Sequence, residues 1–228
     1  MTRVRFAQTP AEALGEVADG ATVMIGGFGP AGQPAALVEA LLAHDARDLV
    51  IISNNAGNGD DPLARLVRDG RVRKIVCSFP RQTDSWHFDD AYRAGRVELE
   101  LVPQGNLAER IRAAGAGIGG FYTPTGFGTP LAAGKETRRI DGVDHVFELP
   151  LRADLALVRA HRADGVGNLV YRKTARNFGP IMAAAAARAV VQVDEVVPTG
   201  GLDPEAVVTP GIYVSAVVAS ASRERAPV

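Results

Sequence analysis

The residues with the clearest potential for chemistry form a glycine-rich loop at residues 25–34, which reads Ile-Gly-Gly-Phe-Gly-Pro-Ala-Gly-Gln-Pro. Within it, Gly27, Gly29 and Gly32 follow the spacing G-x-G-x-x-G, after an apolar run and before a helical pattern. Because glycine has no Cβ atom, the backbone amides of such a loop can approach a ligand closely. We expect the amides of Gly27 and Gly29 to stabilise a negative oxygen, such as that of a thioester carbonyl as it becomes tetrahedral. The same loop would admit the narrow arm of an acyl-thioester carrier.

Two other interpretations of this loop stay open. A nicotinamide-dependent dehydrogenase would use the same spacing to hold a dinucleotide, but it also needs an acidic residue at the end of the next strand. That strand ends in Ser53-Asn54-Asn55, and Pro30 and Pro34 remove amide donors from the loop. Alternatively, the glycines form only a tight turn.

Side-chain amides follow two of the predicted strands directly. Asn54 and Asn55 come at the end of a strand at 48–53, and Gln104 follows a strand at 97–102. Ligands of parallel sheets bind at the carboxyl ends of the strands, where the amides of Asn54 and Asn55 would hold a substrate carboxylate without neutralising it. The structural alternatives are an Asx turn at the asparagines and a helix entry at Gln104.

Helix and strand patterns alternate along most of the chain. Strands are predicted at 21–25, 48–53, 74–79, 97–102, 154–159, 189–193 and 212–219. Helices are predicted from residue 10 to a stop at Gly20, from about residue 34 onward, and at 62–69, 88–94, 106–114 and 178–188. Between 121 and 149 the pattern loosens, with short antiparallel strands near Arg138 and Val146. Alternation of this kind predicts an α/β fold with an open, mostly parallel sheet and helices on both faces. We expect a single domain over 1–228, with a frayed tail at 220–228.

The composition is that of a globular chain rich in glycine. The 228 residues include 25 Gly and 14 Pro, and 46% of them are hydrophobic. The 25 basic and 26 acidic side chains give a net charge of −1, which argues against nucleic-acid binding. The N-terminal residues lack the apolar core of a signal peptide, and no apolar run is long enough to cross a bilayer. We therefore expect a cytoplasmic protein without membrane contact.

The cysteine and the histidines offer little for metal binding or nucleophilic catalysis. Cys77 lies within a predicted strand and is interpreted as a small buried hydrophobic residue. His44, His87, His145 and His161 show neither metal-ligand spacing nor a neighbouring acid. We expect no metal site in this chain.

Several long segments resemble the A (α) subunits of the class I, or 3-oxoacid, coenzyme A transferases. They are GGFGPAGQP (26–34), SNNAGNG (53–59), VPQGNLAERIRAAGAGIGGFYTPTGFGT (102–129), RADLALVRAHRADGVGNLVYRKTARNFGPIMA (152–183) and VVPTGGLDPEAVVTPGIYV (196–214). The resemblance covers nearly the whole chain, and the run PQGNLAERIRAAGAGIGGF is highly specific. The segment CSFPRQTDS (77–85), with SNNAGNG and YRKTARNFGPIM, looks most like the 3-oxoadipate branch of this family. The acetoacetate and acetate branches are the alternative.

The resemblance implies a reaction and a division of labour between two subunits. Members of the family move CoA from a thioester, usually succinyl-CoA, to a 3-oxo acid, and the glutamate that captures CoA belongs to the B (β) subunit. The glutamates of this chain agree, because Glu12, Glu39 and Glu109 fall on predicted helix faces while Glu98 and Glu100 alternate along a strand. The resemblance thus implies a CoA thioester as substrate, no permanently bound cofactor, and an obligate complex, either an αβ pair or its dimer, with a B subunit. It also implies a place in the β-ketoadipate pathway of aromatic-compound catabolism.

The resemblance also assigns roles to single residues. It assigns CoA binding to Gly26, Gly27, Phe28, Gly29, Pro30, Ala31 and Gly32. It implies that Gln104 contacts substrate oxygens. Independently of the resemblance, we expect Arg81, which follows the third strand, to clamp the distal carboxylate that succinate and a six-carbon 3-oxo diacid both carry. A solvated loop arginine is the equally open alternative. Residues 115–120 and the turn at 123–126 would form a backbone corner that shapes the interface with the B subunit.

One alternative belongs to a different functional class. Related folds occur in regulators, so the chain is also compatible with a non-enzymatic acyl-CoA or sugar-phosphate sensor. The sequence shows neither a helix-turn-helix segment nor the basic recognition face that a DNA-binding regulator would need.

Overall fold

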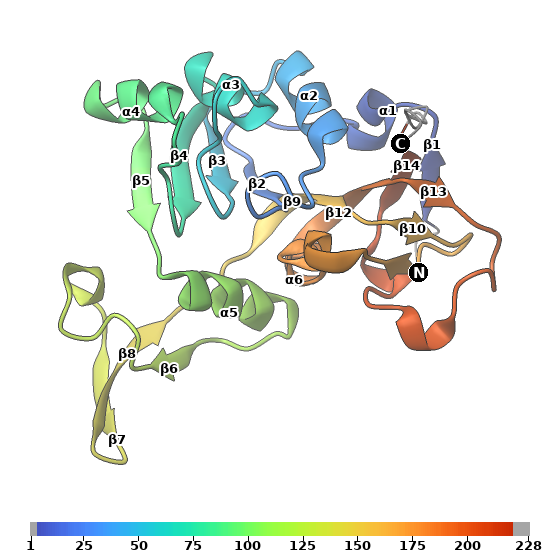
Figure 1. Ribbon diagram of the computed structural model, residues 1–228. Coiled ribbons are helices and arrows are strands. Elements are labelled where there is room, and N and C mark those ends of the chain that lie inside the picture. Colours follow the sequence, from blue (N-terminus) through green and yellow to red (C-terminus); the bar gives the residue numbers. More distant parts are fainter. Residues whose placement is uncertain (1–3, 221–228) are drawn as a thin grey trace.

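The computed structural model describes residues 4–220, so all but the first residue of the expected tail at 220–228 lies outside the described residues. Its centre is an eight-stranded sheet in which every pair of neighbouring strands runs parallel (Figure 1). The strands, in their order across the sheet, are β1 (Arg5–Ala7), β14 (Ala216–Ala219), β12 (Ala186–Val193), β9 (Ala153–Arg159), β2 (Thr22–Ile25), β3 (Leu49–Ile52), β4 (Val72–Cys77) and β5 (Glu98–Leu101).

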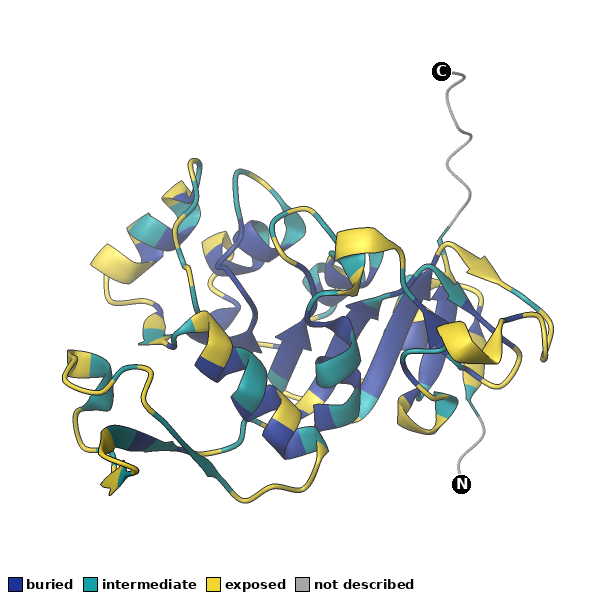
Figure 2. Ribbon diagram, turned by 60° about the horizontal axis from the view of Figure 1, so that its bottom comes forward, coloured by how far each residue is buried: buried dark blue, intermediate teal, exposed yellow. Residues whose placement is uncertain are grey.

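Helices cover both faces of this sheet, as predicted. One face carries α1 (Pro10–Leu14), α2 (Ala35–Ala43), α3 (Pro62–Arg68) and α4 (Trp86–Arg93), and the other carries α5 (Gln104–Gly115) and α6 (Gly179–Ala185). Successive residues of a strand point to opposite faces, so each strand contributes to two cores. Leu49 and Ile51 pack with α1–α4, whereas Val50 and Ile52 pack with α5 and α6. The central strands are accordingly buried on both sides (Figure 2).

The first helix is shorter than predicted. The Thr9 hydroxyl accepts a hydrogen bond from the Glu12 amide at 3.1 Å and so caps the start of the helix, while the Glu12 carboxylate accepts one from the Gln8 amide at 2.8 Å. The helix ends at Leu14, however, because Gly15 adopts a left-handed φ of 59°. The prediction of a stop at Gly20 was wrong.

The helix predicted at 178–188 also ends early. Residues 186–188 belong to β12, where Ala186 pairs with Ala153 and Arg188 pairs with Leu155 of β9. A run of alanines favours a helix, but pairing with a central strand outweighs this intrinsic preference. At the C-terminal end, the predicted strand at 212–219 is confirmed only for β14, because residues Gly211–Tyr213 form a short 3₁₀ helix.

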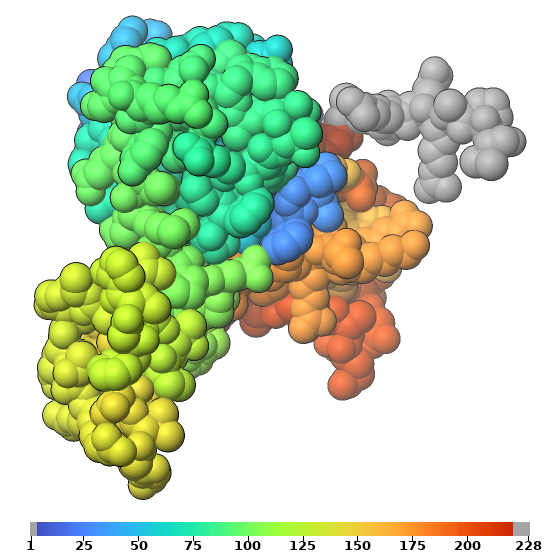
Figure 3. Space-filling model, turned by 60° about the vertical axis from the view of Figure 1, so that its left-hand side comes forward, coloured from blue at the N-terminus to red at the C-terminus, as the bar shows by residue number. Residues whose placement is uncertain are grey.

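A lobe built from residues after α5 projects from the sheet (Figure 3). It holds an antiparallel sheet of β6 (Phe121–Thr123), β8 (Val143–Glu148) and β7 (Thr137–Ile140), together with a 3₁₀ helix at Pro130–Ala132. The strands predicted near Arg138 and Val146 are confirmed. The chain enters the lobe through a tight corner at Gly120, where an added Cβ atom would lie 2.2 Å from the Phe147 ring.

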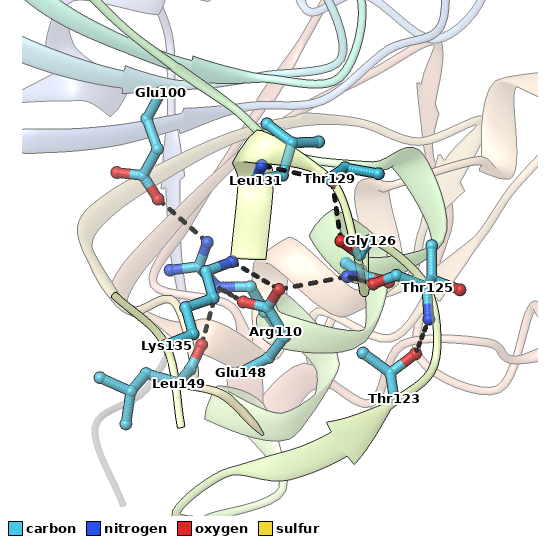
Figure 4. Close-up of polar contacts among 11 residues, drawn as sticks. Glu100, Arg110, Thr123, Thr125, Gly126, Thr129, Leu131, Lys135, Glu148 and Leu149 are labelled. Atoms are coloured by element: carbon cyan, nitrogen blue, oxygen red, sulfur yellow. Dashed lines mark hydrogen bonds and ion pairs between the residues drawn. The ribbon is translucent and has the colours of Figure 1, made fainter. Parts of the chain in front are cut away.

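Charged side chains fix this lobe to α5 (Figure 4). The carboxylate of Glu148, only 2% exposed, accepts a hydrogen bond from Lys135 Nζ at 2.7 Å. Arg110 of α5 lies 3.7 Å from the same carboxylate and 3.0 Å from Glu100. Burial raises the pKa of Glu100, but hydrogen bonds from Lys74 and Arg110 outweigh this effect and hold the pKa below its usual value. These ion pairs and hydrogen bonds connect β5, α5 and the lobe to one another.

Five short strands were not predicted from the sequence: β1, β6 and three strands of two residues each. The two-residue strands form a second small sheet of β11 (Leu169–Val170), β10 (Arg162–Ala163) and β13 (Glu195–Val196). Further 3₁₀ turns lie at Lys173–Arg176 and Pro204–Ala206. Among residues 4–220, no helix has the length and apolar character needed to cross a membrane.

Candidate functional site

The predicted site residues gather at one edge of the central sheet. Because β2, β3, β4 and β5 run parallel, the segments that follow them leave the sheet on the same side. These segments are the glycine-rich loop, the run 53–59, the turn after Cys77 and the start of α5 at Gln104. The shared edge confirms the placement that the strand pattern predicted.

A pocket of about 330 Å³ opens at this edge. Its lining combines Phe28 of the glycine-rich loop and Gln104 of α5 with residues at the start of α6. The full lining is Phe28, Gln104, Gly105, Ala108, Asn177, Phe178 and Ile181. Phe28 is 52% exposed, so an aromatic ring stands at the mouth of a pocket without an ionisable lining side chain. Such a lining suits an uncharged acyl or pantetheine chain with a few polar groups at its reacting end.

Asn54 and Gln104, fifty residues apart, are in direct contact. The Asn54 side-chain oxygen accepts hydrogen bonds from Gln104 Nε2 at 2.8 Å and from the Ser78 hydroxyl at 2.9 Å. Because that oxygen is used twice, the amide nitrogen of Asn54 is the donor left for a ligand: it has no partner within residues 4–220. A nitrogen donor suits a carboxylate or carbonyl oxygen.

Asn55 has a structural role in this geometry. Its side-chain oxygen accepts a hydrogen bond from the Gly57 amide at 2.9 Å, which forms the Asx turn considered as the alternative. Gly57 has a φ of 89°, and a Cβ atom there would lie 2.4 Å from the Ala64 nitrogen. The turn therefore places the glycine against α3 and shapes the segment that presents Asn54. Substrate binding by Asn55 itself stays a prediction.

The amides of the glycine-rich loop are not equally available. Gly26 donates to the Leu157 carbonyl at 3.0 Å, and Phe28 and Ala31 exchange hydrogen bonds of 2.9 and 3.1 Å. The Gly27 amide donates to the Asn177 side-chain oxygen at 3.2 Å. Within the described part of the chain, the Gly29 amide donates to no protein atom, and space is open around its Cα. Of the two expected oxyanion donors, the Gly29 amide is therefore the one without a protein partner in residues 4–220, and its role as a donor to substrate stays a prediction.

Asn177 holds the glycine-rich loop, and the sequence alone did not single it out. Its side-chain oxygen accepts from the amides of Gly27 and Phe178, at 3.2 and 2.7 Å. Its side-chain nitrogen donates to the carbonyls of Ala31 and Thr174, at 2.9 and 2.8 Å. All four hydrogen-bonding capacities of the amide are thus used, and two of the bonds join residues about 150 positions apart in the sequence. No local pattern could reveal this, although Asn177 lies in a segment that carries the family resemblance.

Arg81 lies away from the pocket lining. Its Nε atom is 2.6 Å from a carboxylate oxygen of Asp89 in α4, and its side chain is 57% exposed. Asp89 also contacts Arg93 at 3.5 Å. An anionic substrate group would have to compete with Asp89 for Arg81, so recognition of a distal carboxylate by Arg81 stays a prediction.

The histidines are less isolated than their sequence positions indicated. His87 Nε2 lies 2.9 Å from Asp60, and His161 Nδ1 lies 3.0 Å from Asp194, so the expectation that no acid neighbours a histidine was wrong for these two. The acids come from other elements, which sequence distance hides. Residues 4–220 contain no cluster of three or more His, Cys, Asp or Glu side chains arranged to hold a metal ion.

Cys77 is expected to remain unmodified in the folded protein. The side chain is fully buried, and this burial raises the pKa of the thiol to about 12, so almost no reactive thiolate forms near neutral pH. Labelling by iodoacetamide at pH 8 should be at least about 100-fold slower in the native protein than after unfolding in guanidinium chloride. Fast native labelling that also abolished activity would contradict the interpretation of Cys77 as a core residue.

Comparison with known proteins connects this geometry to one family. A family model described as coenzyme A transferase matches residues 7–220. The A subunit of the 3-oxoadipate CoA-transferase from Pseudomonas putida is 64% identical, over 92% of this chain and 90% of the relative. The protein of the same description from Acinetobacter baylyi is 62% identical, over 94% of each. An acyl-CoA transferase from Escherichia coli O157:H7, solved as a thioester complex with CoA, has a TM-score of 0.85 at 23% identity and covers 99% of this chain and 52% of its own.

Proposed function

The chain belongs to the coenzyme A transferase family, and we propose that it is the A subunit of an enzyme that moves CoA from succinyl-CoA to a 3-oxo acid, specifically 3-oxoadipate. The observation that carries the proposal is the identity above 60% with two 3-oxoadipate CoA-transferase A subunits over more than nine-tenths of the chain. The family match agrees with the motif resemblance, and the pocket at the sheet edge supplies a place for the thioester.

The proposed chemistry is a ping-pong exchange in which a B subunit supplies a glutamate. The glutamate carboxylate attacks the thioester carbonyl of succinyl-CoA and displaces the CoA thiolate, leaving a mixed anhydride. The thiolate then attacks the glutamyl carbonyl, so that succinate leaves and a glutamyl-CoA thioester remains. The same steps run in reverse on 3-oxoadipate. No electrons are transferred, so the reaction needs no redox cofactor.

In that scheme, the residues of this chain bind the substrates and position their reacting groups. The loop from Gly26 to Gly32 lies along the acyl-thioester arm, with the Phe28 ring at the pocket mouth. The Gly29 amide donates to the oxygen that becomes negative in each tetrahedral intermediate, and Gly27 keeps the loop in place through Asn177. The free amide nitrogen of Asn54 and the adjacent Gln104 hold the carboxylate or the oxo oxygen of the acid.

The assembly that we propose is an obligate cytoplasmic complex, either an αβ pair or its dimer, of this chain with a B subunit. Both bacterial relatives are themselves named as one subunit of a larger enzyme, which supports the need for a partner chain. We assign residues 115–120 and the turn at 123–126, together with the projecting lobe, to the interface with that partner.

The experiment that tests the function measures CoA exchange by the purified complex with its B partner. Succinyl-CoA is offered with 3-oxoadipate, acetoacetate or acetate, and the CoA products are separated by chromatography. We expect kcat/KM for 3-oxoadipate to exceed that for acetate by at least about 100-fold, because contacts to a second carboxylate contribute several charge-assisted hydrogen bonds.

Each other outcome of this assay would favour one of the alternative functions. A preference for acetoacetate or acetate would move the chain to those branches of the family. Tight binding of succinyl-CoA without turnover of any acceptor would favour a non-enzymatic acyl-CoA sensor. Tight binding of NAD with none of acyl-CoA would overturn the family-based function altogether.

A further inference from the structure

Three exposed cations lie together without carboxylate partners in residues 4–220. Arg172, Lys173 and Arg176 fall within five residues, at and just before the 3₁₀ turn Lys173–Arg176, and all three are exposed. None of them lies within 4.0 Å of an acidic oxygen of residues 4–220, whereas Arg65, Arg81 and many other surface cations of the chain are ion-paired. We refer to residues 172–176 as the basic turn.

The basic turn is attached to the candidate site by its backbone. Asn177, the next residue, lines the pocket and connects the Thr174 carbonyl to the Ala31 carbonyl of the glycine-rich loop. Gly32 packs so closely against the turn that a Cβ atom there would lie 2.6 Å from the Ala175 carbonyl oxygen. The left-handed φ of 76° at Gly32 also requires a glycine. The cations therefore lie on a rim next to the loop that we assign to the thioester arm.

The surrounding segments contain almost no other charge. Residues 20–38, 53–59, 102–108 and 177–187, which build the pocket and its neighbours, have no Asp, Glu, Lys or Arg. No acidic residue occurs anywhere from 165 to 193. Between residues 165 and 187, the basic turn therefore supplies the only charged side chains, and all three are positive. Every ligand of the proposed reaction is an anion.

From this arrangement we propose that the basic turn is a binding subsite for the anionic end of a substrate whose reacting carbonyl lies in the pocket. This inference rests on the proposed function and names the residues of this chain that would recognise the negative charge of the substrate. The recognised group is a carboxylate or a phosphate, both of which match the planar donor fork of arginine. It belongs to one of two sources: the distal carboxylate of the dicarboxylic acid, or the phosphates of CoA.

The test compares two double variants of equal charge change, each in complex with the B subunit. R172Q/R176Q removes both guanidinium groups of the basic turn. The matched control R47Q/R96Q removes two exposed arginines that also lack ion pairs within the described residues but lie before β3 and β5, at the opposite edge of the sheet. We expect R172Q/R176Q to raise KM about tenfold or more for the recognised substrate, with kcat changed far less and the effect reduced at high salt. The control should retain the wild-type KM.

Substrate pairs then separate the two sources. If the turn holds the distal carboxylate, KM rises for 3-oxoadipate and for the succinyl donor, the rise persists with succinyl-pantetheine, and KM for acetate is unchanged. If it holds CoA phosphates, the increase appears with succinyl-CoA for every acceptor and disappears with succinyl-pantetheine, which lacks those phosphates. Either pattern supports the subsite.

Other results would contradict the anion subsite and leave the proposed transferase function unaffected. Wild-type KM values in R172Q/R176Q, or a loss that is the same for all donors and acceptors, would exclude an anion subsite at the basic turn while leaving an active transferase. Failure of the wild-type complex to transfer CoA would instead refute the proposed function. In that case, isothermal titration of both double variants with free CoA still tests the phosphate source.

Discussion

The isolated chain is expected to show no CoA transfer, and addition of the B subunit is expected to restore full activity. Loss of a covalent nucleophile lowers turnover by about 10⁶-fold, so the exchange of succinyl-CoA with 3-oxoadipate should fall to the uncatalysed background. The measurement is the amount of 3-oxoadipyl-CoA formed by this chain alone, by the isolated B chain and by the mixture.

The structure supports this expectation from the positions of the acidic side chains. Among residues 4–220, the pocket lining holds no carboxylate. The buried Glu148 is neutralised by Lys135 and Arg110, and Glu100 is bound by Lys74 and Arg110. Neither is available to attack a thioester, because a nucleophile must be accessible and activated.

A trapping experiment provides the control. The complex is incubated with succinyl-CoA without an acceptor, and both chains are digested and analysed by mass spectrometry. CoA should be attached to a glutamate of the B subunit, with no adduct on this chain. A CoA adduct on this chain, or exchange by the chain alone, would contradict the assignment of the nucleophile to the partner.

Replacement of Asn177 by alanine is expected to reduce kcat/KM about 100-fold, mostly through kcat, while the fold is retained. The substitution removes the hydrogen bonds to Gly27 and Ala31 that hold the glycine-rich loop, and a displacement of about 1 Å in a catalytic loop can cost a factor of this size. Steady-state kinetics of the complex, together with its thermal unfolding, provide the measurement.

The matched control is Asn168→Ala. Asn168 is also partly buried, and its amide donates to Asp164 and accepts from Gly211, at 2.9 Å each, in a turn outside the pocket lining. Both substitutions should lower the unfolding free energy by about 1–3 kcal/mol, because each leaves backbone or side-chain groups without partners. Only Asn177→Ala should lose activity. Equal activity of the two variants would show that Asn177 stabilises the fold and has no influence on the site.

The prediction of elements from sequence succeeded where burial is uniform along a segment. Residues 49–52 and 75–77 are buried on both faces, as central parallel strands require, and they lie in β3 and β4. It failed at the alanine run 183–187, because alanine gives no contrast between a buried and an exposed face. The two-residue strands β10, β11 and β13 are too short to show any period.

The site could be predicted from sequence only in part, for a related reason. Residues that directly follow parallel strands lie at the same edge of the sheet, and Asn54 and Gln104, which both follow such strands, are within hydrogen-bond distance of each other. It could not show which atoms remain available. The Gly27 amide, expected to face substrate, is used by Asn177, and Arg81 is paired with Asp89.

By itself, the amino-acid sequence determined the fold class, the family and the edge of the sheet at which ligands bind, because these follow from local periodicity and from motifs that are contiguous in the chain. Only the tertiary structure decided which groups can act. The contact of Asn177 with Gly27 and the absence of carboxylates around the basic turn, within residues 4–220, depend on segments far apart in sequence. Hydrogen bonds and ion pairs act over a few ångströms of space, so whether a donor or a charge is free depends on its neighbours in the folded chain.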